Sequence, residues 1–434
     1  MGRVSSNAVG LNRFSGGVVA RLMSVQAYRR LWYGGIGYYN AYWIEIVASG
    51  WMVLVMSGSA FDVGLVGFSR TLPMLVLGLA FGAVSDRMRR TTMLLIVQCA
   101  GVVIAATLST LFILDRANLL ALCIASGLLG CGWASDYSTR RALISEMNAQ
   151  ELTGNAMSLE AMSQQGCKIV ATIVAGALLA AGGAPLAYGV LAVVYAYGVF
   201  AVIRLRRVFD EAAIERSGSV PLLRLIGEGF STVVRIPLIQ GVLLVTVVMN
   251  LLTFPYQQLI PVIAKQILDI GPQRMGILAG ADGIGAIVVA GTLVFRARLA
   301  LAGRFFLGGA MTTSAVVILL GLSRVFPLSL CLQILAGGCA GAFASMQPVL
   351  IINNVEPRLR ARALGVLAMA IGCTPLGILL SGALSSTIGA RATLAGTGAL
   401  AFVLLVLIAV SNRALIRVKV ARAAARTSSA HHQP

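Results

Sequence analysis

Long apolar runs alternate with short polar segments along almost the whole chain. Each run contains about 20 or more mostly apolar residues, the length that an α-helix needs to cross a bilayer core of roughly 30 Å. Backbone groups in hydrocarbon must be hydrogen-bonded within the protein, so these runs predict helices; barrel strands are about half as long. The runs cover residues 33–57, 63–84, 92–114, 117–139, 155–181, 184–203, 237–262, 273–295, 304–323, 326–352, 363–388 and 391–411.

One charged segment, residues 204–236, divides these runs into two sets of six. The pattern predicts an all-α membrane protein with twelve transmembrane helices in two six-helix bundles, residues 33–203 and 237–411. Polar tails, residues 1–32 and 412–434, precede and follow them. The halves also resemble each other weakly, which indicates pseudo-symmetric bundles. The best alignment matches Leu143 with Leu350, Ile144 with Ile351, Ala156 with Ala363 and Met162 with Met369.

Composition and charge indicate the orientation of the chain. Hydrophobic residues make up 58% of the sequence and charged residues 11%, far less charge than a soluble protein of this size carries. Most of the 34 Lys and Arg residues fall on one side of the predicted membrane, in the tails, the central segment and alternate loops. Because positively charged loops stay in the cytoplasm, we expect a multi-pass inner (plasma) membrane protein with both termini cytoplasmic.

The net charge of +19 does not indicate a nucleic-acid partner. The basic residues are spread over short segments, and no soluble domain is predicted that would hold a binding groove. Membrane topology and contact with anionic lipid explain these residues better. We therefore expect membrane lipid as a partner, no nucleic acid, and a monomer.

Glu45 is the most informative charged residue within a predicted helix, because a carboxylate in hydrocarbon is costly and usually functional. It lies near the middle of the first run. Desolvation favours its neutral form, so Glu45 is a candidate to load and release a proton. The alternative is a structural ion pair with Arg70 or Lys168 that stabilises the N-terminal bundle. The sequence leaves both interpretations open.

Other ionisable residues within the runs are further candidates for proton coupling or for a cavity, namely Arg70, Asp136, Lys168 and Asp282. Lys168 is expected to pair with Glu45 rather than to bind an anionic solute. Asp282, beside several glycines, is expected to face a water-filled vestibule rather than to couple transport. Asp136 has Arg140 four residues later, a spacing that brings both side chains to one helix face and predicts a local ion pair.

Polar and aromatic side chains in the first and seventh runs are candidates for a substrate cavity. They are Asn40, Trp43, Asn250, Gln257 and Gln258. An aromatic ring either holds a planar, lipophilic molecule or packs in the core, and amides either bind a solute or join neighbouring helices, which is the commoner role. The predicted cavity is otherwise sparse and apolar.

The sharpest local motif follows the second run and reads Gly82-Ala-Val-Ser-Asp86-Arg87-Met-Arg89-Arg90. It resembles the GxxxDR signature of the major facilitator superfamily. The resemblance implies that Gly82, Asp86, Arg87 and Arg90 form a conformational latch, which holds the two halves together in one state of the transport cycle. The glycine permits close helix packing, and the aspartate accepts charge-assisted hydrogen bonds or caps a neighbouring helix.

Further short stretches are similar to the siderophore and macrolide exporter branch of that superfamily. They are Tyr28–Trp32, Gly50-Trp51, Leu72–Met74, Arg140–Leu143 and Leu259–Pro261. Arg89, where the superfamily usually has glycine, is also similar to that branch. Ala171 and Thr172 depart from the Gly-Pro pair that many drug/proton antiporters carry in helix five, so export is better supported than antiport.

No set of residues indicates covalent chemistry. The two histidines, His431 and His432, lie in the C-terminal tail, no phosphate-binding GxxxxGK[ST] loop occurs, and we expect no metal, cofactor or enzyme activity. The sequence predicts a secondary active transporter that exports amphipathic small molecules of drug or siderophore type by alternating access, driven by the proton gradient. Two alternatives stay open: a proton-coupled importer of a small polar or organic-anion nutrient, and a non-transporting membrane sensor or scaffold.

Overall fold

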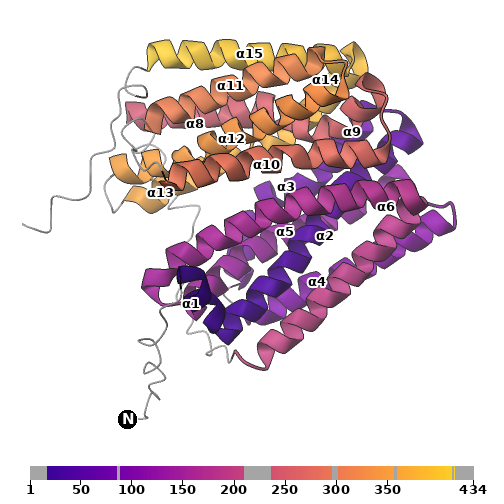
Figure 1. The fold of residues 1–434 in the computed structure, drawn as a ribbon, viewed down its shortest axis with the longest axis vertical. Coiled ribbons are helices and arrows are strands. Elements are labelled where there is room, and N and C mark those ends of the chain that lie inside the picture. Colours follow the sequence, from indigo (N-terminus) through magenta and orange to yellow (C-terminus); the bar gives the residue numbers. More distant parts are fainter. Residues whose placement is uncertain are drawn as a thin grey trace, which may run out of the picture.

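The computed structural model describes residues 17–85, 88–209, 236–295, 302–355, 359–412 and Leu415. These residues form helices joined by short turns, and no strand is found among them (Figure 1). The N-terminal helices are α1 (Val18–Ser24), α2 (Gln26–Ser57), α3 (Ala60–Ser85), α4 (Arg90–Ile113), α5 (Leu119–Met147) and α6 (Gln150–Arg206). The C-terminal helices are α8 (Pro237–Val248), α9 (Ile260–Val262), α10 (Pro272–Phe295), α11 (Ala302–Leu322), α12 (Phe326–Asn354), α13 (Arg360–Ile371), α14 (Thr374–Ile388) and α15 (Ala390–Ser411). Between α8 and α10 lie turns of other helix types, namely the π-helical η2 (Met249–Thr253), the 3-10 helical η3 (Phe254–Leu259) and the π-helical η4 (Ile263–Ile267).

The segment predicted as one helix at 237–262 is longer than expected and changes its helix type several times. It runs from α8 through η2, η3 and α9 to the end of η4. Pro255 and Pro261 lack the backbone N–H that a continuous α-helix needs, which accounts for the interruptions. The run predicted at 363–388 is likewise divided into α13 and α14, just before Pro375.

The long element α6 is a hairpin of two helical arms (Figure 1). Its 57 residues bend at Gly182 and Gly183, whose backbone angles are not helical, and Pro185 lies at the start of the second arm. Gly183 has a φ of 63°, in the left-handed region that glycine adopts without steric strain. The two arms correspond to the predicted runs 155–181 and 184–203.

Figure 1 shows the helices in two stacked groups, α2 to α6 and α8 to α15. The end of the molecule at which α1 lies and α2 begins is named the termini end. The opposite end, named the far end, carries the turns at Gly58, Asp115, Gly183, Asp269 and Gly389, each of which has a positive φ. The predicted tails and central loop fall largely on residues outside the described ones, so those domain boundaries stay predictions.

The two halves approach each other closely toward the far end, through glycines. A Cβ atom built on Gly276 of α10 would lie 3.0 Å from Gly176 Cα of α6. One built on Gly64 of α3 would lie 3.0 Å from Gly382 Cα of α14. Helix backbones pack at such distances only where small residues face each other. One cluster of buried apolar side chains extends through both halves, so the halves form a continuous contact here.

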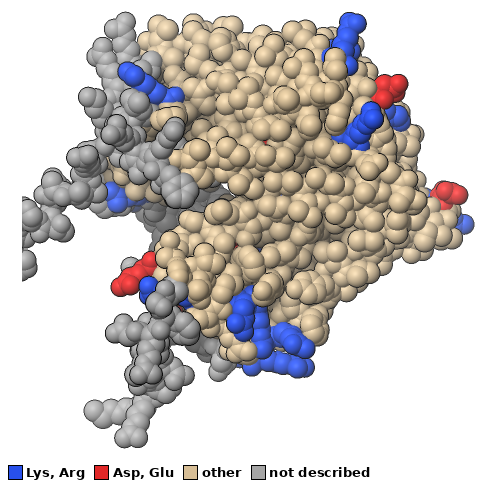
Figure 2. All heavy atoms as spheres, in the orientation of Figure 1, with Lys and Arg blue, Asp and Glu red and all other residues tan. Residues whose placement is uncertain are grey.

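Eight helical segments among the described residues are long and apolar enough to cross a membrane. They are α4, α5, most of α6, Pro237–Ile267, α11, α12, Arg362–Ile388 and α15. Three further long helices pack among these segments, α2 and α3 (32 and 26 residues) in the N-terminal group and α10 (24 residues) in the C-terminal group (Figure 1). The predicted all-helical membrane architecture is confirmed, whereas the count of twelve crossings stays a prediction. On the face shown in Figure 2, the described charged side chains lie toward the ends and corners and leave a broad uncharged belt.

Candidate functional site

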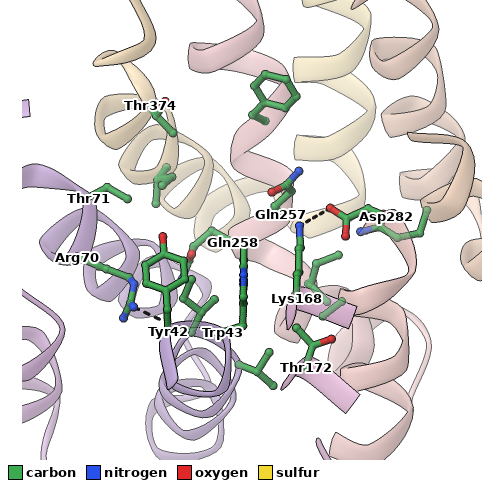
Figure 3. A pocket seen from close by; sticks show the side chains of 17 residues that line it. Tyr42, Trp43, Arg70, Thr71, Lys168, Thr172, Gln257, Gln258, Asp282 and Thr374 are labelled. Carbon is green, nitrogen blue, oxygen red and sulfur yellow. Dashed lines mark hydrogen bonds and ion pairs between the residues drawn. The ribbon is translucent and has the colours of Figure 1, made fainter. Parts of the chain in front are cut away.

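A cavity of about 180 Å³ lies between the two halves (Figure 3). The N-terminal half contributes polar and aromatic side chains from α2, α3 and α6, namely Tyr42, Trp43, Arg70, Thr71, Lys168 and Thr172. The C-terminal half contributes polar side chains from η3, α10, α12 and α14, namely Gln257, Gln258, Asp282, Gln333 and Thr374. Because both halves supply its walls, a movement of one half against the other changes the shape of this cavity.

An ion pair joins the two halves across the cavity (Figure 3). Lys168 Nζ on α6 lies 2.5 Å from Asp282 Oδ2 on α10, and the two side chains are 9% and 6% exposed. The Lys168 ammonium also lies 4.6 Å from the centroid of the Trp43 ring, within the range of a cation–π interaction. Asp282, expected to face a water-filled vestibule, therefore lines the cavity with its charge paired.

The expected pair between Lys168 and Glu45 is wrong. Helix α10 packs tightly on α6, and a Cβ atom on Gly280 would lie 3.3 Å from Ile169 Cα. This close crossing brings the carboxylate of Asp282, from the other half, to the Lys168 ammonium. A contact between helices that are more than 100 residues apart in sequence has no local signature, so the sequence did not indicate it.

Glu45 instead forms an ion pair with Arg70 inside the N-terminal half. Its Oε1 atom accepts a hydrogen bond of 2.9 Å from Ser126 Oγ on α5, and Glu45 is fully buried outside the cavity wall. Arg70 reaches the cavity, where its Cζ atom lies 4.4 Å from the Tyr42 ring centroid. Of the two interpretations that the sequence leaves open, this geometry favours the structural pair.

Three of the five residues predicted for the substrate cavity line it, and two do not. Trp43, Gln257 and Gln258 are in the cavity wall, as Figure 3 shows. Asn40 donates a hydrogen bond of 2.7 Å to the Ile36 carbonyl on its own helix. Asn250 donates one of 2.8 Å to the Thr246 carbonyl and accepts one of 2.8 Å from Thr374 Oγ1. The amides of Asn40 and Asn250 therefore serve helix structure and helix contacts.

The cavity is more polar than the sequence predicted. Besides the predicted Gln257 and Gln258, Gln333 and three threonines join the charged pair in its wall. Gln333 could have been noticed as one of two glutamines in the apolar run 326–352. Threonines in helices give no such signal, because their side chains commonly bond carbonyl groups of their own helix. Amides, one ion pair and aromatic faces are groups that bind and orient a solute. In the part of the chain that the structure describes, no three His, Cys, Asp or Glu side chains gather to hold a metal ion.

A second buried charge cluster lies within the N-terminal half. Asp136 and Arg140 form the ion pair expected from their spacing, with an Nη2 to Oδ1 distance of 2.6 Å. Glu160 of α6 joins them, since its Oε1 lies 3.8 Å from Arg140 Nε and accepts a hydrogen bond from Tyr39. Sequence reasoning missed Glu160. It is a lone carboxylate five residues inside the predicted run 155–181, a signal equal in kind to that of Glu45.

The predicted latch motif is only partly described. Gly82 lies in the last turns of α3, and Asp86 and Arg87 fall outside the described residues. Arg90, at the start of α4, pairs with Glu146 near the end of α5, which belongs to the same half. The role of the motif in holding the two halves together stays a prediction.

Residues 19–434 match the family model described as transmembrane secretion effector, a family of the major facilitator superfamily. The multidrug efflux pump Tap of Mycolicibacterium fortuitum is 26% identical over 359 residues, which cover 81% of this chain and 87% of that protein. The staphyloferrin A transporter of Staphylococcus aureus is 24% identical over 343 residues, which cover 78% of this chain and 84% of that protein.

Solved transporters have a similar fold. A bacterial homologue of the human lysosomal transporter Spinster, in an inward-facing and unoccupied conformation, superposes with a TM-score of 0.69 at 15% identity, covering 93% of this chain and 99% of that one. The nucleoside transporter NupG superposes with a TM-score of 0.66 at 13% identity, covering 90% and 99%. The peptide transporter POT in complex with sulfate superposes with a TM-score of 0.68 at 12% identity, covering 91% and 96%. At these identities the likeness concerns the fold alone.

Proposed function

Because this chain belongs to the transmembrane secretion effector family of major facilitator superfamily transporters, we propose that it exports amphipathic small molecules by alternating access. The exported molecules are of drug or siderophore type, and the proton gradient drives their movement. The proposal refines what the family establishes, a multi-pass membrane transporter. The observation that carries it is the ion pair between Lys168 and Asp282, which joins the two halves across a polar cavity.

The cross-half ion pair suits alternating access for a physical reason. Two buried opposite charges stabilise each other only while they touch, and separation leaves each desolvated and unpaired. A solute that offers its own charge or hydrogen bonds to Lys168 or Asp282 replaces the lost partner. Binding thus lowers the cost of moving one half against the other, as a population shift requires.

The packing of the halves supports an inward-open state for this structure. The close glycine crossings, Gly176 with Gly276 and Gly64 with Gly382, lie toward the far end. A hydrogen bond of 3.3 Å from Gln266 to the Gly58 carbonyl joins the halves at the same end. If the termini are cytoplasmic, the far end faces the outside, and the cavity is closed to that side. Export then proceeds from solute uptake at the termini end.

We propose twelve membrane crossings with both termini in the cytoplasm of a bacterial plasma membrane. Each of the two arms of α6 counts as one crossing. The continuous segment from α8 to η4 counts as one crossing, and so do α13 and α14 together. Helices α2 and α3 and helix α10 complete the two sets of six. The excess of Lys and Arg on one side of this topology supports the orientation. We also propose that the protein works as a monomer surrounded by lipid.

The cavity chemistry supports an amphipathic substrate. Trp43 and Tyr42 offer aromatic faces, while Lys168, Asp282 and the nearby glutamines offer charge and hydrogen bonds. A molecule with a planar apolar part and at least one charged or polar group satisfies both kinds of wall. The relatives named as a multidrug efflux pump and a staphyloferrin A transporter support this class, and the name of the first supports the direction.

A proton-coupled importer of a small polar or organic-anion nutrient is the second candidate. The observation that favours it is the polarity of the cavity, because three glutamines and a buried ion pair also suit a polar nutrient. The direction of net transport separates the two candidates. An exporter lowers the amount of compound in cells, and an importer raises it.

The decisive test compares compound accumulation in cells with and without the gene. Siderophores, macrolides and cationic dyes serve as compound classes, a proton uncoupler removes the gradient, and Lys168→Met serves as the matched inactive variant. We expect cells with the gene to hold less of at least one class, and the uncoupler or the variant to abolish that difference. Equal accumulation for every class, or export that survives the uncoupler, would contradict the proposal.

A further inference from the structure

A buried charge cluster lies in the N-terminal half, separate from the cavity wall. Asp136 and Arg140 come from α5, Glu160 from α6 and Tyr39 from α2, and none is more than 3% exposed. Arg140 donates two hydrogen bonds to Asp136, of 2.8 and 2.6 Å, and one of 3.0 Å to the Leu31 carbonyl. Glu160 accepts a hydrogen bond from Tyr39 Oη, and its ion-pair contact with Arg140 Nε is longer, at 3.8 Å.

The charges in this cluster do not balance. A guanidinium stays protonated, and here its two-pronged face is occupied by Asp136. Glu160 shares the same cation at a longer distance. With both carboxyl groups ionised, the cluster carries one net negative charge away from water. An uncompensated buried carboxylate is costly and takes up a proton instead. A proton on the Glu160 carboxylate removes the excess charge.

The groups that face Glu160 do not supply a second close cation. They are Tyr28 and Tyr39 of α2, Asp136, Arg140 and Arg141 of α5, and Cys167 of α6. Arg141 is the other cation among them. Its Cζ atom lies 3.4 Å from the centroid of the Tyr137 ring, and its Nη1 donates to the Tyr137 carbonyl at 3.3 Å. Arg141 is thus held on its own helix, and Glu160 depends on Arg140 alone for an ion pair within 4 Å among the described residues.

The cluster and the cavity share two helices. Glu160 and Lys168 lie on the same arm of α6, eight residues apart, which is about 12 Å along the helix axis. Helix α2 touches both, because Tyr39 donates to Glu160 and the Trp43 ring packs on the Lys168 ammonium. A charge change at Glu160 therefore acts on the helix pair that also carries the cation of the cross-half ion pair.

We propose that Glu160, which shares Arg140 with Asp136, is a proton-binding site of this transporter. Its role as the coupling site rests on the proposed proton-driven transport. Binding transfers one proton from water to a Glu160 carboxylate oxygen and leaves Arg140 paired with Asp136. Release of that proton restores the net negative charge of the cluster. The site lies nearer the termini end of α6 than Lys168 does, so protons and solute meet the same half at different depths.

The test titrates the purified full-length protein in detergent and follows tryptophan fluorescence. Trp32 and Trp133 are suitable reporters, because Trp32 Nε1 donates to Ser163 beside Glu160 and the Trp133 ring lies 6.2 Å from that of Tyr39. We expect the fluorescence of the wild type to change with pH in a transition that involves one proton, and we expect Glu160→Gln to remove this transition. Glu151→Gln, an exposed position in the first turn of the same helix, is the matched control and should keep the transition.

A second variant guards against misfolding of the first. Asp136→Asn leaves one carboxylate for one guanidinium, so it should also remove the wild-type transition while Glu160 stays in place. Both variants should elute as the wild type does on size exclusion. A transition that is unchanged in Glu160→Gln or in Asp136→Asn would overturn the proposal.

Transport in proteoliposomes separates the proton site from the proposed function. We expect Glu160→Gln to keep exchange of compound down its own gradient and to lose accumulation driven by an imposed pH difference. Accumulation that survives in this variant would overturn the coupling role. If the wild type shows the Glu160-dependent transition but transports no compound under a pH difference, the proton site stands and the proposed function fails.

Discussion

The two buried ion pairs near the centre of the molecule have the same chemistry and different positions. Glu45 and Arg70 both belong to the N-terminal half, and Ser126 of the same half completes the site of Glu45. Lys168 and Asp282 belong to different halves and line the cavity between them. In the proposed alternating access, movement of the halves would leave the first pair intact and would break or stretch the second. The position of a buried pair relative to moving units thus decides whether it stabilises a unit or responds to transport.

Breaking the pair within one half should give the largest effect on stability. Glu45→Gln leaves the Arg70 guanidinium buried without its counter-charge, so we expect a loss of about 3–5 kcal/mol. Thermal unfolding of the detergent-solubilised protein measures it. The double variant Glu45→Leu with Arg70→Met removes both charges and should recover most of that loss. A Glu45→Gln protein as stable as the wild type would show that the pair is not structural.

Breaking the pair between the halves should instead reduce transport while leaving the protein folded. Hydrogen bonds to charged groups contribute about 1.5–3 kcal/mol, so Lys168→Met should lower the transport rate by roughly tenfold or more. Rates in proteoliposomes and yields after size exclusion measure the two properties. The exchanged variant Lys168→Asp with Asp282→Lys tests whether the pair alone suffices, and full activity of Lys168→Met would remove the pair from the mechanism.

A methyl group at the far-end crossing should shift the balance between conformations. Gly276→Ala places a Cβ atom in steric clash with the Thr172 carbonyl oxygen and 3.0 Å from Gly176 Cα, and such overpacking costs about 1–3 kcal/mol in the state that is closed there. We expect roughly tenfold faster labelling, from outside, of a Thr71→Cys reporter in a background without the native cysteines. Gly291→Ala on the same helix has nothing within 4 Å and is the control. Equal labelling of both variants would contradict the closed far end.

The aromatic rings beside the cations of the two ion pairs, Lys168 and Arg70, offer the test with the smallest expected effect. Trp43 packs on Lys168 and Tyr42 on Arg70, and a desolvated cation–π contact contributes about 1–2 kcal/mol. Trp43→Leu should weaken the apparent affinity for substrate roughly fivefold. Tyr42→Leu should change that affinity less and lower the unfolding temperature more. Transport at varied substrate concentration gives the first quantity, and the reverse order of effects would contradict the comparison.

Much of the architecture could be predicted from the sequence. The lengths of the apolar runs indicated helices, and the run boundaries correspond to described helices within a few residues in most cases. The pair between Asp136 and Arg140 was predictable because both residues lie on one helix, four positions apart. The interruptions by η2, η3 and η4 were not predicted, although Pro255 and Pro261 could have indicated them.

The candidate site was predicted less well, because its residues meet across helices that are distant in sequence. Trp43, Gln257 and Gln258 were identified. The amides of Asn40 and Asn250 instead form hydrogen bonds within helices or between neighbouring ones. The predicted partner of Lys168, Glu45, was wrong, and Glu160 was not identified as a candidate. A periodic pattern shows that a charged residue is buried, but it does not show which other buried charge lies beside it.

The sequence by itself determined that this chain forms apolar helices in a membrane, because hydrocarbon tolerates backbone groups only when they are hydrogen-bonded internally. It also indicated which charged side chains are buried and therefore need a partner. Tertiary structure alone decided the partners, since glycine crossings such as that of Gly280 in α10 against Ile169 in α6 bring one half against the other. Distances between helices set which charges neutralise each other, and those distances depend on the packing of the whole bundle.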